Sequence, residues 1–147
     1  MDVDSPLFSI VVPTFNREGH IGRCLDSIVH QSFHDHEVVV VDNASTDGTV
    51  EVALDFAGRL DVRVLVNDSN RERSYSRNRG AEHARGRFVV FLDSDDELRP
   101  DSLELAAAFV EADPDRRFFF QRLTIVDESG ATVYEPVVRK SHTMQRT

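Results

Sequence analysis

The stretch FVVFLDSDDE, residues 88–97, runs from five apolar residues into four carboxylates, at Asp93, Asp95, Asp96 and Glu97. Two carboxylates about 5 Å apart repel by roughly 3 kcal/mol at an effective dielectric of about 20. Such a cluster at the end of a buried strand needs a cation, a donor-rich loop or open solvent. The apolar half therefore predicts a buried strand, and the acidic half predicts either a cation site or a surface turn before a helix.

Outward from this stretch, the apolar pattern changes period repeatedly, which predicts alternating strands and helices. Short apolar runs predict strands at residues 7–12, 38–41, 62–66 and 87–92. One-sided apolar spacing and cap signals predict helices that follow Asn16 as an N-cap, cover 49–57 and 75–84, and begin near Pro100. The segment RRFFFQRLTIVDESGATVYEP alternates like a β-hairpin that turns at Ser129 and Gly130.

Continuous apolar strands joined by helices predict an α/β fold, with a mostly parallel sheet, helices on both faces and a C-terminal β-hairpin. Ligands of such sheets bind at the carboxyl ends of the strands, near a switch in strand order. We therefore expect the loops PTFN (13–16), DNASTDG (42–48) and DSDDE (93–97) to be neighbours in space. One domain is expected over residues 1–138, followed by a loose tail at 139–147.

The composition argues against several classes of protein. A net charge of -9 over 147 residues argues against sequence-independent binding of nucleic acid. No apolar run approaches the ~20 residues of a membrane span, and the start lacks a basic signal-peptide region, so a cytoplasmic protein is expected, either free or at the inner face of the membrane. The lone cysteine, Cys24, excludes an internal disulfide and is expected in the core. Of the six histidines, His34 and His36 have a possible ligand spacing but are expected in a solvated polar loop, and the other four form no ligand pattern.

Phosphate binding would require an arrangement other than the familiar nucleotide fingerprints. No G-x-G-x-x-G follows the first strand, and no G-x-x-x-x-G-K-[ST] occurs in the chain. A divalent cation, Mn²⁺ or Mg²⁺, would be held by one or two strand-end carboxylates and completed by diphosphate oxygens and water. The DSDD stretch supplies such carboxylates.

Four stretches in order resemble the nucleotide-sugar-binding, N-terminal half of family 2 inverting glycosyltransferases, which have a Rossmann-like GT-A fold. They are SIVVPTFNRE, CLDSIVHQSFHDHEVVVVDNASTDGT, SYSRNRGAEHARGRFVVFLDSDDE and RPDSLE. The resemblance, over about residues 8–114, implies a nucleotide diphosphate sugar as donor, with UDP- or dTDP-sugars favoured and GDP-sugars as an alternative. It also implies metal-dependent, inverting transfer of a hexose-type sugar to a saccharide, a lipid-linked or a small-molecule acceptor.

The resemblance assigns roles to residues after the first three strands. Pro13, Thr14 and Phe15 match the family loop beside the nucleobase, with phenylalanine where tyrosine is frequent. Asp42 matches the acid that accepts a hydrogen bond from a uracil or thymine ring. Arg77 matches the arginine near the base and the phosphates, whereas the arginines at 71, 73 and 79 are expected on a solvated helix face.

The acidic stretch matches the D-x-D pair of the same family. By this match Asp95 contacts the metal, and Asp93 lies toward the ribose or the metal shell. Asp96 exchanges roles with Asp95 if the register shifts by one residue. Ser94, inside the pair, and Glu18, just after the first loop, are assigned to the same donor site.

The catalytic base is not apparent in the sequence. Inversion needs a carboxylate that takes the acceptor proton, and in this family it belongs to a later ED-like motif. Asp127 and Glu128 are weak candidates because they fall in the predicted hairpin turn. Two alternatives therefore stay open: a non-catalytic nucleotide-sugar binding module or donor-half fragment, and a receiver-like signalling domain, which would lack its strand-end lysine.

Overall fold

The computed structural model describes residues 5–113, 115, 117–119, 124–127 and 129–134. Its elements are β1 (Phe8–Thr14), α1 (Glu18–Val29), β2 (His36–Asp42), α2 (Thr49–Leu54), β3 (Val62–Val66), α3 (Arg73–His83), β4 (Phe88–Phe91), α4 (Ser102–Glu111), β5 (Ile125–Val126) and β6 (Thr132–Tyr134). Every strand and helix expected from the apolar pattern is present. The predicted tail at 139–147 lies outside the described residues.

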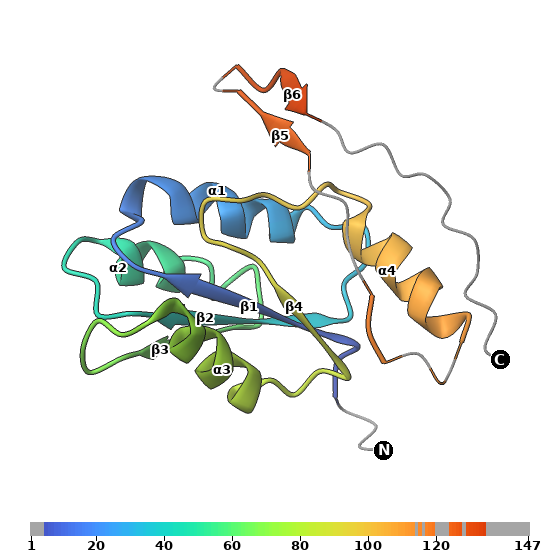
Figure 1. Cartoon of the computed structure of the whole chain (residues 1–147), viewed down its shortest axis with the longest axis horizontal. Coiled ribbons are helices and arrows are strands. Elements are labelled where there is room, and N and C mark those ends of the chain that lie inside the picture. The colour runs from blue at the N-terminus through green and yellow to red at the C-terminus, as the bar shows by residue number, and fades with distance from the viewer. Residues whose placement is uncertain (1–4, 114, 116, 120–123, 128, 135–147) are drawn as a thin grey trace, which may run out of the picture.

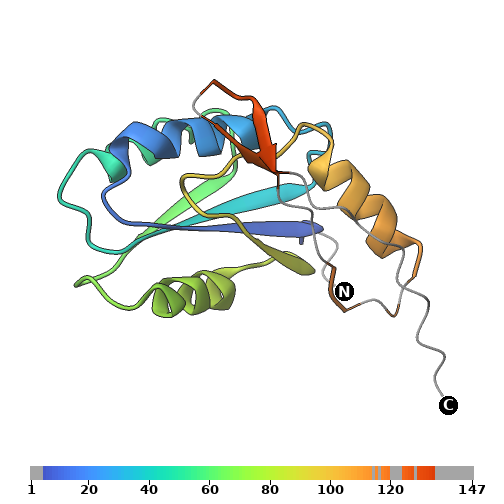
Figure 2. The same ribbon diagram turned by 45° about the horizontal axis from the view of Figure 1, so that its top comes forward.

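Four parallel strands form the sheet, in the order β3-β2-β1-β4. Helices α1 and α2 lie on one face and α3 lies on the other (Figures 1 and 2). The chain moves outward from β1 to β2 and β3, then returns to the opposite side of β1 with β4. The switch in strand order therefore falls between β1 and β4, which confirms the predicted α/β architecture and locates the edge where a ligand is expected.

The two faces of the sheet are covered very differently. On the α1 face, the helix buries Ile21, Cys24, Leu25 and Ile28 in a large cluster that also contains Leu103 of α4. Full burial of one such aliphatic side chain contributes about 1.5–3 kcal/mol, so this face supplies most of the apolar stabilisation.

The α3 face has a much smaller apolar cluster, whose buried members are Val11, Val39 and Val41. Gly80 of α3 lies directly over this cluster, and a Cβ atom at this position would overlap the side chain of Val11. The helix therefore approaches the sheet closely where its own side chains bury little. Only Ser76 and Gly80 of α3 are buried, among the residues that the structure describes in that helix.

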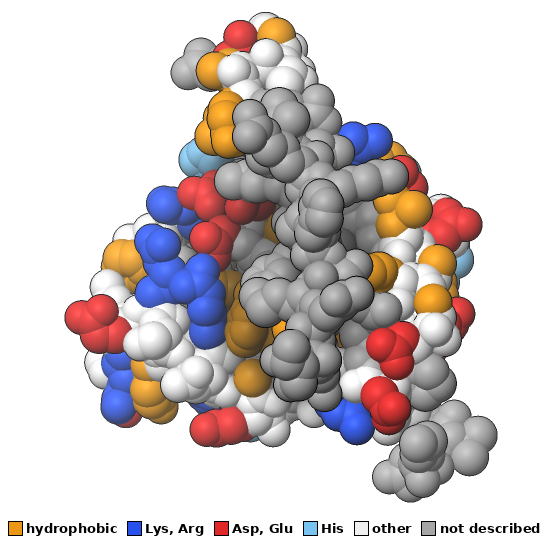
Figure 3. Space-filling view, turned by 45° about the vertical axis from the view of Figure 1, so that its right-hand side comes forward, with side chains coloured by type: hydrophobic (Ala, Val, Ile, Leu, Met, Phe, Trp, Pro, Cys, Tyr) orange, Lys and Arg blue, Asp and Glu red, His pale blue; other side chains and the backbone are white. Residues whose placement is uncertain are grey.

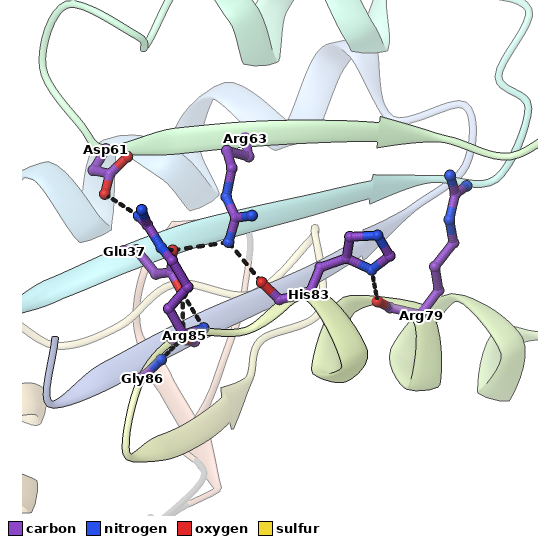
Figure 4. Close-up of polar contacts among 8 residues, drawn as sticks. Glu37, Asp61, Arg63, Arg79, His83, Arg85 and Gly86 are labelled. Carbon is purple, nitrogen blue, oxygen red and sulfur yellow. Dashed lines mark hydrogen bonds and ion pairs between the residues drawn. The ribbon is translucent and has the colours of Figure 1, made fainter. Parts of the chain in front are cut away.

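A buried carboxylate, Glu37, closes the amino end of the sheet below α3. Its oxygens accept hydrogen bonds from Ser9 Oγ at 2.6 Å, from the backbone N–H of Arg85 at 2.6 Å and from the Arg63 guanidinium at 2.9 Å (Figure 4). Arg85 adds a bond from Nε at 2.7 Å, and Arg63 also donates to the carbonyl of His83, the last residue of α3. One carboxylate thus ties β1, β2, β3, α3 and the turn into β4 together.

The surroundings of Glu37 decide its charge. Burial by itself raises the pKa of Glu37, but the hydrogen bonds from Ser9 and Arg85 and the charge of Arg63 outweigh burial and lower the pKa to about 2. The side chain is fully buried, so it is an ionised carboxylate held in the interior by two guanidinium groups.

The start of α1 differs from the prediction. Arg17, not Asn16, occupies the N-cap position, and its side chain makes no capping hydrogen bond. Asn16 has a φ of 48°, in the left-handed region that asparagine tolerates, and its Oδ1 accepts a hydrogen bond from the backbone N–H of Thr46 at 2.8 Å. The predicted cap is wrong because a contact with the neighbouring loop uses this side chain instead.

Other boundaries shift by a few residues. Helix α2 ends at Leu54, earlier than the predicted 57, and α3 begins at Arg73, two residues before the predicted start. Pro100 lies just before α4, whose N-cap is Asp101. The antiparallel pair β5–β6 confirms the predicted hairpin, which stands apart from the main sheet in Figure 1. None of the helices in the described part of the chain combines the length and hydropathy of a membrane span.

Candidate functional site

A pocket of about 330 Å³ opens at the carboxyl end of the parallel sheet. Residues that follow each of the four strands contribute to its lining, together with the first residue of α3. The lining consists of Pro13, Thr14, Phe15, Arg17, Asn43, Asn70, Arg71, Arg73, Asp93, Ser94 and Asp95. The predicted meeting of the PTFN, DNASTDG and DSDDE loops is therefore confirmed.

The end of β1 forms one wall together with the end of β2. Phe15 is 38% exposed, whereas Thr14 is buried and its Oγ1 has no hydrogen-bond partner among the described residues. Thr14 is the register partner of Asp42, a buried residue that does not itself line the pocket. Asp42 Oδ2 accepts a hydrogen bond from the backbone N–H of Ser45 at 2.9 Å, while the buried Oδ1 is unpartnered in the same part of the chain. Buried unpaired oxygens are costly, by about 1–3 kcal/mol each, and a bound ligand can satisfy them.

The acidic loop after β4 supplies the opposite wall. Asp93 accepts a 2.5 Å hydrogen bond from the Arg77 guanidinium, and Asp95 lies 3.7 Å from that of Arg17. Asp96 does not line the pocket. Burial, together with the charges of Asp95 and Asp93, raises the pKa of Asp96. The two arginines therefore leave uncompensated negative charge on this loop.

The carboxylates of the pocket could hold a divalent cation only if a bound ligand supplied further oxygen atoms. No cluster of three or more His, Cys, Asp or Glu side chains able to hold a metal is found in the described residues. Asp93 and Asp95 could supply two oxygen ligands, and Mg²⁺ or Mn²⁺ at nucleotide sites typically takes the remaining ones from phosphate and water. The excess negative charge around Asp96 fits such an ion.

Arginines provide the positive charge of the pocket. Arg71 pairs with Asp68 at 3.0 Å and lies over the ring of Tyr75. Arg73 lines the pocket and forms no ion pair within the described residues. Sequence reasoning expected both on a solvated face; they are exposed, yet they line the pocket. Arg77, the expected ligand arginine, is not a lining residue and instead contacts Asp93.

On the face drawn in Figure 3, basic and acidic side chains lie next to one another at the left of the view rather than in separate patches. Two ion pairs hold the acidic loop, one between Arg77 and Asp93 and one between Arg17 and Asp95. Both pairs are partly exposed, so solvent screens them and each holds its partner only weakly.

Sequence reasoning missed Asn43, which organises the loop between β3 and α3. Its side chain is buried and makes four hydrogen bonds of 2.7–2.9 Å, with Asn67, Asn70 and both backbone polar groups of Arg71. The position of Asn43 directly after the end of β2 was the available signal, because strand ends of a parallel sheet carry the ligand-binding residues.

The acidic loop is anchored at both ends. The backbone N–H of Leu92 donates to Val11, and the carbonyl of Asp93 accepts a weak 3.6 Å hydrogen bond from Cys24 Sγ. Beyond the carboxylates, the backbone N–H of Leu98 donates to Ser27 Oγ at 3.0 Å. Both side-chain anchors come from α1, where Cys24 is buried and Ser27 half-buried, so helix and loop are fixed relative to each other.

Cys24 belongs to the core, as predicted, since its side chain is 1% exposed. Burial, reinforced by the charges of Asp96, Asp95, Glu97 and Asp93, raises the pKa of Cys24 to about 12. The thiol is therefore neutral and unreactive beside the acidic loop.

The remaining predicted residues lie away from the pocket lining. Glu18 accepts a hydrogen bond from the backbone N–H of Gly48 at 3.1 Å and joins α1 to the DNASTDG loop. Asp127 uses Oδ1 to accept bonds from Ser129 and Ala131 in the exposed hairpin turn, and these bonds lower its pKa, that from Ser129 most. A turn-forming carboxylate with a lowered pKa is poorly suited to act as a base. Glu128 lies outside the described residues.

Comparison with protein families gives one match over most of the chain. Residues 9–145 match the family described as "Glycosyl transferase family 2". A PGL/p-HBAD biosynthesis glycosyltransferase of Mycobacterium bovis (strain BCG / Pasteur 1173P2) is 40% identical over 108 residues, which cover 72% of this chain and 42% of the relative. The chain thus spans less than half the length of that relative.

Solved structures that resemble this one include two complexes with nucleotide sugars. TarS 1-349 of S. aureus in complex with UDP-GlcNAc has a TM-score of 0.68 at 37% identity, covering 71% of this chain and 31% of that one. The mannosyltransferase PcManGT from Pyrobaculum calidifontis, in complex with GDP-Man and Mn²⁺, has a TM-score of 0.68 at 33% identity, covering 76% and 34%. These likenesses confirm the predicted fold class.

Proposed function

The chain belongs to glycosyl transferase family 2, and we propose that its pocket binds a nucleotide diphosphate sugar with a divalent cation for inverting transfer to an acceptor hydroxyl. The observation that carries the proposal is the composition of the pocket: two aspartates of the D-x-D pair and three arginines, Arg17, Arg71 and Arg73, meet at the switch in strand order. Membership of this family removes the receiver-like alternative.

The arginines have the chemistry that a leaving diphosphate needs. Negative charge builds on the diphosphate as the bond to the sugar breaks, and guanidinium groups bind phosphate oxygens through charge-assisted hydrogen bonds. Arg73 is the best placed of the three, because no ion pair holds it within the described residues. A divalent ion held by Asp93 and Asp95, when bound, neutralises the same charge as a Lewis acid.

The end of β1 and Asp42 are proposed to receive the base. Asp42 Oδ1 is a buried acceptor without a partner in the described chain, and the imide N–H of uracil or thymine is a matching donor. Phe15 follows Thr14, the register partner of Asp42, and is an exposed aromatic surface on which a base can stack. Guanine also offers a ring N–H, and solved relatives include complexes with UDP-GlcNAc and with GDP-Man, so the base has to be tested.

The first test is a calorimetric titration with UDP, dTDP and GDP in Mn²⁺ and again in chelator. The uncompensated acidic loop in a chain of net charge -9 should repel a bare diphosphate, so nucleotide binding is expected to weaken strongly without the ion. Equal affinities in both conditions would sink the metal proposal.

The second test separates base recognition from metal binding. Asp42→Asn is expected to weaken the preferred pyrimidine nucleotide by about 1.5–3 kcal/mol, the value of a charge-assisted hydrogen bond, and to keep the dependence on Mn²⁺. Asp101→Asn, a half-exposed carboxylate outside the pocket, is the matched control. A loss of metal dependence in Asp42→Asn would contradict the separate roles.

Turnover is a separate question from donor binding. No carboxylate other than Asp93 and Asp95 lines the pocket in the described residues, and general base catalysis typically contributes 10² to 10⁴-fold. The 147-residue chain is therefore expected to bind the donor and to form glycosylated product slowly or not at all. Incubation with UDP-, dTDP- and GDP-sugars and acceptors, with nucleotide release and product followed separately, checks this. Fast product formation that disappears in Asp127→Asn would place the base in the hairpin.

A further inference from the structure

We propose that Asn43 is a positioning residue of the donor pocket, which acts by fixing the backbone and side-chain arrangement of Asn70 and Arg71. The inference rests on the proposed function, because it concerns how the donor site is assembled. Residues 67–72 connect β3 to α3 without helix or strand structure, yet this loop supplies two of the pocket-lining side chains.

The hydrogen bonds of Asn43 replace the regular structure that this loop lacks. Its Oδ1 accepts from the backbone N–H of Arg71 at 2.9 Å, and its Nδ2 donates to the carbonyl of the same residue at 2.7 Å. One side-chain amide therefore satisfies both backbone polar groups of Arg71, as a neighbouring strand would. The second Nδ2 hydrogen is donated to Asn70 Oδ1 at 2.7 Å.

Asn43 itself has no freedom to turn. Its backbone N–H donates to the carbonyl of Thr14, and its Oδ1 also accepts from Asn67 Nδ2 at 2.9 Å. Asn67 is buried and is held in turn by Ser76 and Arg79 of α3. Asn43 is thus held by β1 through its backbone and by α3, through Asn67, at its side-chain amide.

The bonding capacity of Asn43 is fully used inside the protein. A carboxamide has two N–H donors and two acceptor lone pairs, and each of these four has a protein partner. Asn43 lines the pocket but keeps no donor or acceptor for a ligand, so it acts through its neighbours. Asn70, by contrast, accepts with its oxygen and has amide N–H groups without a partner among the described residues. Arg71 presents a guanidinium that contacts Asp68 and the ring of Tyr75.

A double-mutant cycle tests whether Asn43 works through Arg71. Affinity for UDP in Mn²⁺ is measured for the wild type, Asn43→Ala, Arg71→Ala and the double variant. Each single change is expected to lower the affinity about tenfold, and the double variant should stay within about threefold of the weaker single variant, because the two changes remove one function. Ser9→Ala removes a buried hydroxyl at the other end of the sheet and is the control: it should lower the melting temperature and leave the affinity unchanged.

Asn43→Asp covers the case in which Asn43→Ala does not fold. It keeps the size of the side chain and the two acceptor contacts, loses both donated bonds, and should show the same coupling to Arg71. A loss of about a hundredfold in either double variant, or an unchanged affinity in a folded Asn43 variant, would overturn the inference while the proposed function stands. If the wild-type chain binds none of UDP, dTDP and GDP, whether Mn²⁺ is present or absent, the inference and the proposed function are both overturned.

Discussion

At the amino end of the sheet one buried carboxylate, Glu37, lies between two arginines, Arg63 and Arg85, whereas at the carboxyl end several aspartates share two arginines. The pKa of Glu37 is lowered to about 2 despite burial. The pKa of Asp96 is raised, first by burial and then by its acidic neighbours. The same kind of side chain therefore meets opposite electrostatic surroundings within one small sheet.

This difference separates a structural carboxylate from a ligand-binding one. Where hydrogen bonds and positive charge exceed the negative charge, a carboxylate stabilises the fold and has no capacity left for a ligand. Where negative charge is in excess, the folded protein tolerates repulsion that a bound cation can relieve. The comparison predicts that changes at the amino end alter stability and changes at the carboxyl end alter binding.

The largest effect is expected for Glu37→Gln. Removing the buried charge leaves Arg63 without a counter-charge in the described residues, whereas Arg85 keeps its pair with Asp61. The change also weakens charge-assisted hydrogen bonds of about 1.5–3 kcal/mol each, so a loss of about 3–5 kcal/mol is expected. Urea unfolding measures the loss, and UDP affinity of the folded fraction should be unchanged. Glu51→Gln, on the exposed side of α2, is the matched control. A decrease of less than about 1 kcal/mol in the free energy of unfolding would show that Glu37 does not stabilise the amino end of the sheet as proposed.

The second effect is the pH dependence of the stabilisation by Glu37. Because the pKa of Glu37 falls from 4.5 to about 2 on folding, its stabilisation is complete above about pH 4.5 and is lost as the pH falls through about 2. The shift corresponds to about 3 kcal/mol. Urea unfolding between pH 6 and pH 2 should show this slope in the wild type. The slope should be clearly smaller in Glu37→Gln, and an identical slope in both would contradict the assignment.

The third effect lies at the opposite end. Asp95→Asn is expected to remove the part of UDP binding that depends on Mn²⁺, a loss of at least about tenfold or 1.4 kcal/mol. Its ion pair with Arg17 is half-exposed, so the free energy of unfolding should change by less than about 1 kcal/mol. Titration and urea unfolding of the same variant measure both. If Asp95→Asn lowers the free energy of unfolding but keeps the Mn²⁺ dependence of UDP binding, Asp95 is a structural carboxylate and not a ligand-binding one.

The smallest effect is expected for Asp96→Asn. A raised pKa means that the folded state disfavours the ionised form, so removal of the charge should stabilise the protein at pH 7, by no more than about 0.5 kcal/mol. The gain should shrink as the pH falls and Asp96 in the wild type becomes protonated. Thermal unfolding of the wild type and the variant, at pH 7 and at a more acidic pH, checks this. Lost Mn²⁺ dependence of UDP binding in this variant would move the metal contact from Asp95 to Asp96.

The architecture was predictable because it depends on periodicity. Buried runs such as Val38, Val39, Val40 and Val41 can hardly be anything but a strand of a covered parallel sheet, and this fixes which loops share an edge. The hairpin at Gly130 was equally readable from its turn residues.

The details of the pocket were not predictable for a physical reason. Asn16 lies two residues after β1 and Asn43 directly after β2, and propensity alone suggests a cap or a turn for each. Their real partners, Thr46 and Arg71, are about 30 residues away, so only the assembled loops reveal them. The lining role of Arg71 follows from the same contact.

The double anchoring of the acidic loop has a consequence for how this site can vary. Between the attachment of Asp93 to Cys24 and that of Leu98 to Ser27, the chain has to cross a fixed gap with a fixed number of residues. Side chains in between point to a pocket or to solvent and can be exchanged at little structural cost, whereas an insertion or deletion would pull one anchor from α1. Over evolutionary time the length of this loop should therefore be kept more strictly than its composition.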